Sequence, residues 1–367
     1  MPSSDRVAII GTVGVPSRYG GFETLAEQLV TRLSDRYRLT VYCSRPAYPE
    51  RPATFQNARL RYIPLNANGP QSIAYDVWSM LDAMTSHDVI LVLGVSGTAA
   101  LPVIRRISRA RIVVNIDGLE WKRAKWGAVA RQILRRSEAL AVRHADVVIA
   151  DNQVIVDSVR ERYGVEAQLI EYGGDHARRE LADPVYFRSM GVPEGPYAFT
   201  VCRVEPENNL HLILEGVARA KALPLVAVGN WHRSDYGRQL RRQFGGRPDI
   251  VLLDPIYEQR RLDALRSNCA VYLHGHSAGG TNPSLVEAMS LGLAIFAHDV
   301  SYNRETTEGR ARYFATASEL AELLRTVSRG DLDQISAQMQ AIAQRRYTWE
   351  RIARRYEETF TGRSKGG

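Results

Sequence analysis

The sequence has few cysteines and no long apolar run. Its three cysteines, Cys43, Cys202 and Cys269, lie far apart, each in or beside a predicted strand. This pattern favours buried thiols in a reducing compartment over disulfides or a metal cage. No apolar run approaches the roughly 18 residues that a membrane-spanning helix needs, and the polar start does not resemble a signal peptide. We therefore expect a cytoplasmic protein whose membrane contact is peripheral.

Biased composition is also absent, apart from the final GRSKGG. With 45% hydrophobic and 24% charged residues, the rest of the chain is expected to fold. A length of 367 residues is too great for one core and fits two domains. The net charge of +8 indicates an acidic partner, which could be nucleic acid, an anionic membrane or a phosphorylated substrate.

Short β-branched runs alternate with helical patterns along the chain. Strands are predicted at 6–10, 39–43, 60–64, 88–93, 111–116, 146–150, 197–202, 223–229, 249–254, 270–275 and 293–297. Continuous apolar strands separated by helices are typical of parallel sheets covered on both faces. We predict an α/β fold of two doubly wound, Rossmann-like domains facing a central cleft, because the central break does not suit a closed barrel.

The domain boundaries follow from a stretch of glycines, prolines and charges. An N-terminal domain is predicted over 1–175, a linker over 176–196 and a C-terminal domain over 197–345. Residues 346–367 are predicted to form a helix that packs back on the N-terminal domain, followed by a disordered tail.

A glycine-rich stretch, GTVGVPSRYGGFET, spans residues 11–24 between the first predicted strand and the first predicted helix. Such a turn can cradle phosphate through its N–H groups and the helix N-terminus, or it can be a tight turn. Arg18, Gly20 and Gly21 are its candidate ligand contacts.

A second glycine-containing turn lies within HGHSAGGTNPSLVEAMSLGLAIFA, residues 274–297. Asn282 is a good N-cap and Pro283 a good first helical residue, so a helix is predicted there with free N–H groups on Ser284 and Leu285. Its candidate contacts are Gly279, Gly280, Thr281, Asn282, Pro283, Ser284 and Leu285. Glu287, one turn in, is either solvated or an acceptor for ligand hydroxyls.

The stretch CRVEPENNLHLIL, residues 202–214, adds a cation at a strand end. Arg203 could bind phosphate oxygens with two hydrogen bonds or could be an ordinary surface residue. Asn208 and Asn209 are predicted to cap the next helix, and Asn208 is also a candidate substrate contact.

These motifs together resemble the retaining nucleotide-sugar glycosyltransferases of the GT-B fold, family 4, and within them the capsule and O-antigen rhamnosyltransferase branch. The resemblance rests on GTVGVPSRYGGFETLAE, NIDGLEWKRAKWG, ADNQ, EYGGDHA, RVEPENN, GGTNPSLVEAM and YTWERIARRYEE, which span essentially the whole chain. It implies transfer of a sugar, best matched by rhamnose from dTDP-rhamnose, to a glycan acceptor carried on a lipid in bacterial surface polysaccharide synthesis.

The resemblance also assigns roles. It implies that the donor diphosphate lies between Gly20 and Gly21 on one side and Thr281 to Leu285 on the other, that Arg203 binds the phosphates and that Glu287 binds the ribose. The chain departs from the wider family at Asn208, where a lysine is usual, at Gly279, where a glutamate is usual, and at Asp117, where many relatives have a histidine. These departures indicate an altered donor geometry.

Glycosyl transfer requires stabilisation of a leaving diphosphate and of positive charge at the anomeric carbon. Arg203 and helix N-termini would stabilise the charge of the diphosphate without a metal or another cofactor. His274 and His276 are interpreted as polar lining, because no tight cluster of metal ligands is apparent. The resemblance implies retention of configuration by front-face attack, and Asp117 is a candidate catalytic carboxylate on the acceptor side.

The segment 121–144 is strongly basic, with seven Lys or Arg and one acid, Glu138. It is either a solvated helix face or a surface for anionic lipid, and some of its residues could line the acceptor pocket. The candidate membrane contacts are Trp121, Lys122, Arg123, Lys125, Trp126, Arg131 and Arg135. Nucleic acid is a poorer partner because no known binding module is present.

The sequence gives weaker support to other functions. A nicotinamide enzyme lacks support because G-x-G-x-x-G is absent, and GVSGT at 94–98 does not complete a serine-hydrolase motif. A GT-B sugar-nucleotide epimerase or hydrolase, or a non-catalytic nucleotide-sugar-binding protein, stays open as an alternative.

Overall fold

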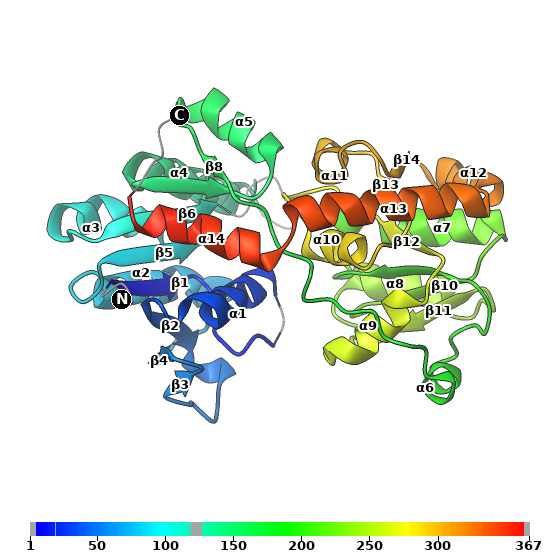
Figure 1. Cartoon of the computed structure of the whole chain (residues 1–367), viewed down its shortest axis with the longest axis horizontal. Helices are drawn as coiled ribbons and strands as arrows, with labels where there is room; N and C mark the ends of the chain where they lie inside the picture. The colour runs from blue at the N-terminus through cyan, green and yellow to red at the C-terminus, as the bar shows by residue number, and fades with distance from the viewer. Residues whose placement is uncertain (1–4, 19, 117, 119–126, 363–367) are drawn as a thin grey trace. The chain divides into compact units, whose positions relative to one another are not determined.

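The computed structural model describes residues 5–18, 20–116, 118 and 127–362. The chain forms two compact units (Figure 1). Unit 1 comprises Met1–Glu171 together with Trp349–Gly367, and unit 2 comprises Tyr172–Thr348. Each unit is an α/β structure built on one sheet.

Unit 1 contains an eight-stranded sheet in the order β3-β4-β2-β1-β5-β6-β7-β8. Its strands are β1 (Arg6–Ile10), β2 (Arg38–Ser44), β3 (Thr54–Phe55), β4 (Ala58–Ile63), β5 (Val89–Leu93), β6 (Arg111–Ile116), β7 (Val147–Ala150) and β8 (Gln168–Leu169). All neighbours pair in parallel except β3, which is antiparallel to β4. The predicted apolar strands are confirmed, whereas the two-residue strands β3 and β8 are too short to leave a sequence pattern.

The helices of unit 1 cover both faces of this sheet. They are α1 (Gly21–Leu33), α2 (Ser72–Ala83), α3 (Leu101–Ile107), α4 (Ala128–His144), α5 (Gln153–Tyr163) and α14 (Trp349–Phe360). The connections through α2, α3 and α4 all run in one direction across the sheet, and that through α1 runs in the other. Because parallel crossovers are right-handed, α1 lies on the face opposite to α2, α3 and α4.

The C-terminal helix α14 belongs to unit 1, where it contacts α1 and β6 (Figure 1). Tyr356 is completely buried, and its hydroxyl accepts a hydrogen bond from Asn115 Nδ2 at 2.5 Å. Glu357 forms an ion pair of 2.6 Å with Arg36, which follows α1. The end of the chain therefore completes the core formed by its first half.

Unit 2 has a six-stranded, entirely parallel sheet in the order β11-β10-β9-β12-β13-β14. Its strands are β9 (Ala198–Val201), β10 (Leu225–Val228), β11 (Ile250–Leu253), β12 (Val271–His274), β13 (Ile295–His298) and β14 (Arg312–Phe314). Its helices are α6 (Pro184–Ser189), α7 (Leu210–Ala220), α8 (Asp235–Phe244), α9 (Gln259–Ser267), α10 (Pro283–Ser290), α11 (Ser301–Thr306), α12 (Ala317–Thr326) and α13 (Arg329–Arg346). The predicted second α/β sheet is thus present.

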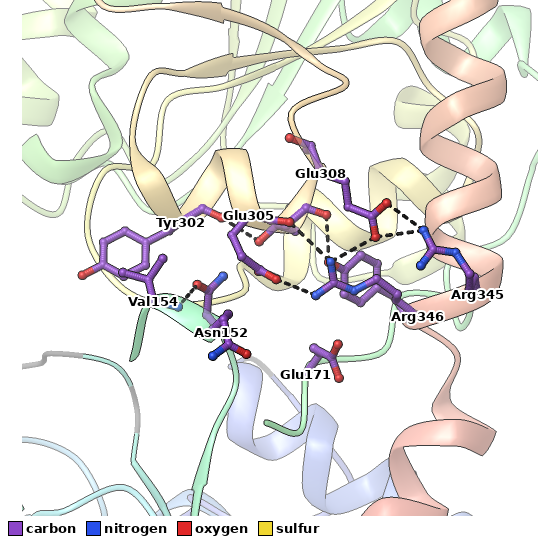
Figure 2. Close-up of polar contacts among 12 residues, drawn as sticks. Asn152, Val154, Glu171, Tyr302, Glu305, Glu308, Arg345 and Arg346 are labelled. Atoms are coloured by element: carbon purple, nitrogen blue, oxygen red, sulfur yellow. Dashed lines mark hydrogen bonds and ion pairs between the residues drawn. The ribbon is translucent and has the colours of Figure 1, made fainter. Parts of the chain in front are cut away.

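Side-chain interactions fix the helix ends in each unit (Figure 2). In unit 2, Arg346 pairs with Glu305 at 2.7 Å and with Glu308 at 3.2 Å, and Arg345 pairs with Glu308 at 2.7 Å, so the end of α13 is tied to α11. In unit 1, the Asn152 side chain caps α5 by accepting a hydrogen bond of 3.1 Å from the Val154 N–H.

Candidate functional site

The predicted donor residues of unit 2 gather at the carboxyl ends of two neighbouring strands. Arg203 follows β9, and the loop 275–282 follows β12, which pairs with β9. In open parallel sheets, ligands bind beyond this edge. The topology therefore brings Arg203 and the start of α10 to one end of the sheet, although they are distant in the sequence.

Asn208 joins these two segments. Its Nδ2 donates to the Arg203 carbonyl at 2.7 Å, and its Oδ1 lies 2.8 Å from His276 Nδ1. Both ends of this amide are occupied and the residue is buried. Asn208 therefore holds the two loops together. Asn209 is the N-cap residue of α7 as predicted, but its side chain makes no cap bond and its amide donates instead to the Gly275 carbonyl at 2.9 Å. Asn208 does not cap α7.

The start of α10 confirms one prediction and corrects another. Asn282 is the N-cap and Pro283 the first helical residue, as predicted. The expected free N–H groups are not free, because Ser284 N–H donates to Asn282 Oδ1 at 3.0 Å and Leu285 N–H to the Asn282 carbonyl at 3.1 Å. An anion at this end would be favoured by the helix dipole and by groups of the preceding loop.

The loop before α10 requires glycine at residue 279. Gly279 has φ +129°, a conformation that side-chain-bearing residues rarely adopt. A glutamate at this position would strain the loop, so its absence follows from the backbone path. Thr281, which follows Gly280, is buried.

Glu287 lies on α10 between two basic side chains. Its Oε2 is 2.7 Å from Arg266 Nη2, and its Oε1 is 3.2 Å from His176 Nε2. Arg266 comes from α9 and is only 1% exposed, while the Glu287 side chain is 13% exposed. The carboxylate is therefore held in a fixed orientation by a buried cation.

Arg266 also forms an ion pair with a second carboxylate. Its Nη1 lies 3.2 Å from Asp263 Oδ1, and Asp263 Oδ2 accepts from the Arg178 N–H at 3.1 Å. Burial by itself would raise the pKa of Glu287, but the charge of Arg266 and the hydrogen bond from His176 outweigh it and hold that pKa below its usual value. Glu287 is thus ionised at neutral pH.

Sequence reasoning missed Arg266 and His176. His176 lies in the EYGGDHA motif, which marked the segment without assigning the histidine a role. Arg266 is one arginine among many on a polar helix, and no local signal distinguishes it. Long-range packing alone brings both residues to Glu287.

His274, at the end of β12, is buried beside Tyr272 and His276. Burial, with a contribution from His298, lowers the pKa of His274 to about 3, so the ring is neutral. Across the described part of the chain, no three His, Cys, Asp or Glu side chains are grouped so as to hold a metal ion.

The glycine-rich loop of unit 1 is held by carboxylates of α1. Glu23 Oε1 accepts from the Val13 N–H at 2.8 Å and from Thr12 Oγ1 at 3.1 Å. Glu27 Oε2 accepts from the Ser17 N–H at 2.5 Å. The Val13 and Ser17 amides donate to the protein's own carboxylates. This part of the loop is therefore a turn fixed by internal hydrogen bonds, and these two amides are not available to phosphate.

Gly20 and Arg18 end this loop. Gly20 has φ +130° directly before α1, and a Cβ there would meet the Glu23 carboxylate, so only glycine fits. Arg18 donates to the Ala47 carbonyl at 3.0 Å and pairs with Glu50 at 3.2 Å, with more than half of its side chain exposed. Ligand contacts of Arg18, Gly20 and Gly21 stay predictions.

Several candidate residues lie outside the described part of the chain. They are Asp117, Trp121, Lys122, Arg123, Lys125 and Trp126. Arg131 and Arg135, on α4, are described and exposed.

Comparison with known proteins gives two family matches. Residues 4–175 match a family described as "Domain of unknown function (DUF1972)", and residues 186–344 match "Glycosyl transferases group 1". The second match lies within unit 2 and includes Arg203, α10 and Glu287. The sequence has no match among curated proteins.

Solved structures share the fold of the chain. Sucrose-phosphate synthase from Thermosynechococcus elongatus aligns with a TM-score of 0.82 at 15% identity, covering 97% of this chain and 98% of that one. Anabaena Alr3699/HepE, solved in complex with UDP and glucose, aligns with a TM-score of 0.76 at 17% identity, covering 98% and 100%. A structure described as "Trehalose-6-phosphate from E. coli bound with UDP-2-fluoro glucose" aligns with a TM-score of 0.70 at 10% identity, covering 98% and 99%. The chain has the GT-B fold.

Proposed function

We propose that the chain is a glycosyltransferase that takes its sugar from a nucleotide-sugar donor. The glycosyl transferase group 1 match over 186–344 supports this, as do GT-B neighbours solved with UDP-glucose and with UDP-2-fluoro glucose. The observation that carries the proposal is Glu287, a carboxylate that the buried Arg266 keeps charged beside the start of α10.

Each group at this edge of the sheet has a proposed role. The Arg203 guanidinium and the start of α10 bind the donor diphosphate and stabilise its charge as it leaves. The Glu287 carboxylate accepts hydrogen bonds from two ribose hydroxyls, since its orientation is fixed by Arg266 and His176. Asn208 positions the backbone of Arg203 relative to the loop after β12.

The finer assignment follows the sequence resemblance. The proposed reaction transfers rhamnose from dTDP-rhamnose, with retention and without a metal, to a lipid-linked glycan acceptor in bacterial surface polysaccharide synthesis. Asp117 is the proposed acceptor-side carboxylate. A lipid-linked acceptor requires the protein to work at a membrane surface, and the exposed arginines of α4 support such a contact.

A thermal-shift panel of UDP, dTDP and GDP tests donor binding. A ligand at 100 times its Kd stabilises the protein by about 2.7 kcal/mol, so the cognate nucleotide should raise the Tm. Arg203→Ala should abolish this shift, whereas Arg219→Ala, on the exposed face of α7, should preserve it. The absence of a shift with all three nucleotides would contradict the proposal.

Product analysis with the bound donor tests the reaction. Sugar transferred to a glycan acceptor supports the glycosyltransferase. Free sugar or an epimerised nucleotide sugar would support a hydrolase or epimerase, and nucleotide-sugar binding without any product would support a non-catalytic binding protein.

A further inference from the structure

Helix α2 is apolar on its outer face as well as on its inner face, where Tyr75, Met80 and Ala83 are buried. Ile73, Trp78 and Leu81 are 42%, 49% and 44% exposed, whereas Asp76 and Ser79 of the same helix are buried. A surface helix ordinarily turns its apolar stripe to the core and its polar residues to water. Three large apolar side chains are therefore left on the outer face of α2.

The neighbouring helices extend this apolar surface. Val103 and Ile107 of α3 are 57% and 62% exposed, and Ile133 of α4 is 46% exposed. The crossovers through α2, α3 and α4 follow one another along the sheet in the same direction, so the three helices lie on one face of it, and α3 packs against α4 (Figure 1). We call the outer surface of α2, α3 and α4 the apolar-basic face.

The charge of this face has one sign. Arg106, Arg131 and Arg136 are exposed on α3 and α4. Two of the three acidic residues on these helices are not exposed on this face. Asp76 is buried, and Glu138 is 1% exposed and pairs with Arg162 at 2.7 Å. The remaining acid, Asp82, is paired with Arg61 at 3.0 Å. An anionic partner is therefore favoured.

We propose that the apolar-basic face docks on an anionic lipid bilayer. Exposed aliphatic and tryptophan side chains flanked by arginines suit the interface of such a bilayer, where apolar groups enter the headgroup region and cations attract the lipid phosphates. A second copy of the chain would instead bring the same arginines against one another. This docking deepens the proposed function, because it would hold the enzyme beside a lipid-linked acceptor.

Docking of this kind is peripheral. Among the described residues, none of the helices combines the length and the apolar character needed to cross a bilayer. The bound protein would therefore lie on the surface, held by side chains of α2, α3 and α4.

Co-sedimentation of the full chain with vesicles tests the docking. Vesicles of phosphatidylcholine with phosphatidylglycerol should bind the protein, and those of phosphatidylcholine alone should bind it much less. The triple variant I73S/W78S/L81S should weaken binding by about tenfold or more, because it removes the apolar contact. Its matched control is L181S/V185S/Y257S, which removes apolar side chains that are 66–92% exposed in unit 2 and should bind like wild type.

The charge contribution is tested with Arg131→Gln and Arg136→Gln together. A loss of about fivefold per arginine is expected on anionic vesicles, decreasing with added salt. Arg329→Gln, at an 87% exposed arginine of α13, is the matched control. Circular dichroism of every variant verifies that it folds.

Three outcomes would overturn the docking. They are equal vesicle binding by the apolar triple variant and its control, no preference for anionic vesicles, and a wild-type dimer that the triple variant converts to a monomer. The last would assign the face to a second copy. Nucleotide binding by the triple variant is measured in parallel, so failure of the docking is distinguished from failure of the glycosyltransferase proposal.

Discussion

Replacing Arg266 by methionine should reveal what this buried cation does. Arg266 is 1% exposed and pairs with Glu287 at 2.7 Å and with Asp263 at 3.2 Å. Methionine fills much of the same volume without a charge or hydrogen bonds. The variant would leave two largely buried carboxylates without their cation. Such a change lowers the free energy of unfolding more than replacing the whole ion pair by apolar residues does.

The magnitude follows from the burial. Removing one partner of a buried ion pair costs about 3–5 kcal/mol. For a unit of this size, about 2–4 °C of Tm is lost per kcal/mol, so the transition of unit 2 should fall by about 6–20 °C in calorimetry. Arg260→Met on the same helix is the control: Arg260 is 80% exposed and pairs with Glu180, so about 1 kcal/mol or less is expected.

The loss should depend on pH in a defined direction. In wild type the pKa of Glu287 lies below its ordinary value, so its contribution to stability is present at neutral pH and is lost as the pH falls through that pKa. Without Arg266, burial would raise the pKa of Glu287, so the folded state would be more stable with this carboxyl protonated than with it ionised. The difference in stability between wild type and variant should therefore be largest near pH 7 and shrink toward pH 4.

Two results would refute this reasoning. One is a Tm of Arg266→Met within about 2 °C of wild type at pH 7. The other is a loss that stays constant with pH. The double variant R266M/E287Q should recover part of the stability, because the uncompensated charge on Glu287 is then gone.

Further predictions concern the two loops and the last helix. Glu23→Ala should cost about 1–3 kcal/mol in denaturant unfolding, because the Val13 N–H and the buried Thr12 hydroxyl lose their acceptor; an unchanged midpoint would contradict this. Gly279→Ala should cost about 1–3 kcal/mol or weaken nucleotide binding through strain at φ +129°, whereas Gly195→Ala, in open space, should do neither in calorimetry and titration. Deleting 349–367 removes several fully buried side chains, worth about 6–12 kcal/mol, so unit 1 should unfold; native circular dichroism and protease resistance would refute this.

The sequence allowed the strands and the helix start at Pro283 to be predicted because these depend on neighbours in the chain. A run such as VILVL at 89–93 is buried on both faces wherever its sheet forms. Asn282 and Pro283 supply a cap and a preset φ within two residues. The same local reasoning failed for the Ser284 N–H, because it did not count the Asn282 side chain as that group's own acceptor.

By itself, then, the sequence determined the two largely parallel sheets with their covering helices and the helix start at Asn282 and Pro283. It also determined that Arg203 follows a strand and that Glu287 lies on the helix after Pro283. Tertiary structure decided what surrounds them. It placed His176 and Arg266 beside Glu287. It buried Asp76 and exposed Trp78 on α2. It also placed the Glu23 carboxylate where it accepts a hydrogen bond from the first glycine-rich loop. The physical reason is that periodicity and capping act over a few residues, whereas ion pairing and burial depend on which distant segments the sheet order makes neighbours.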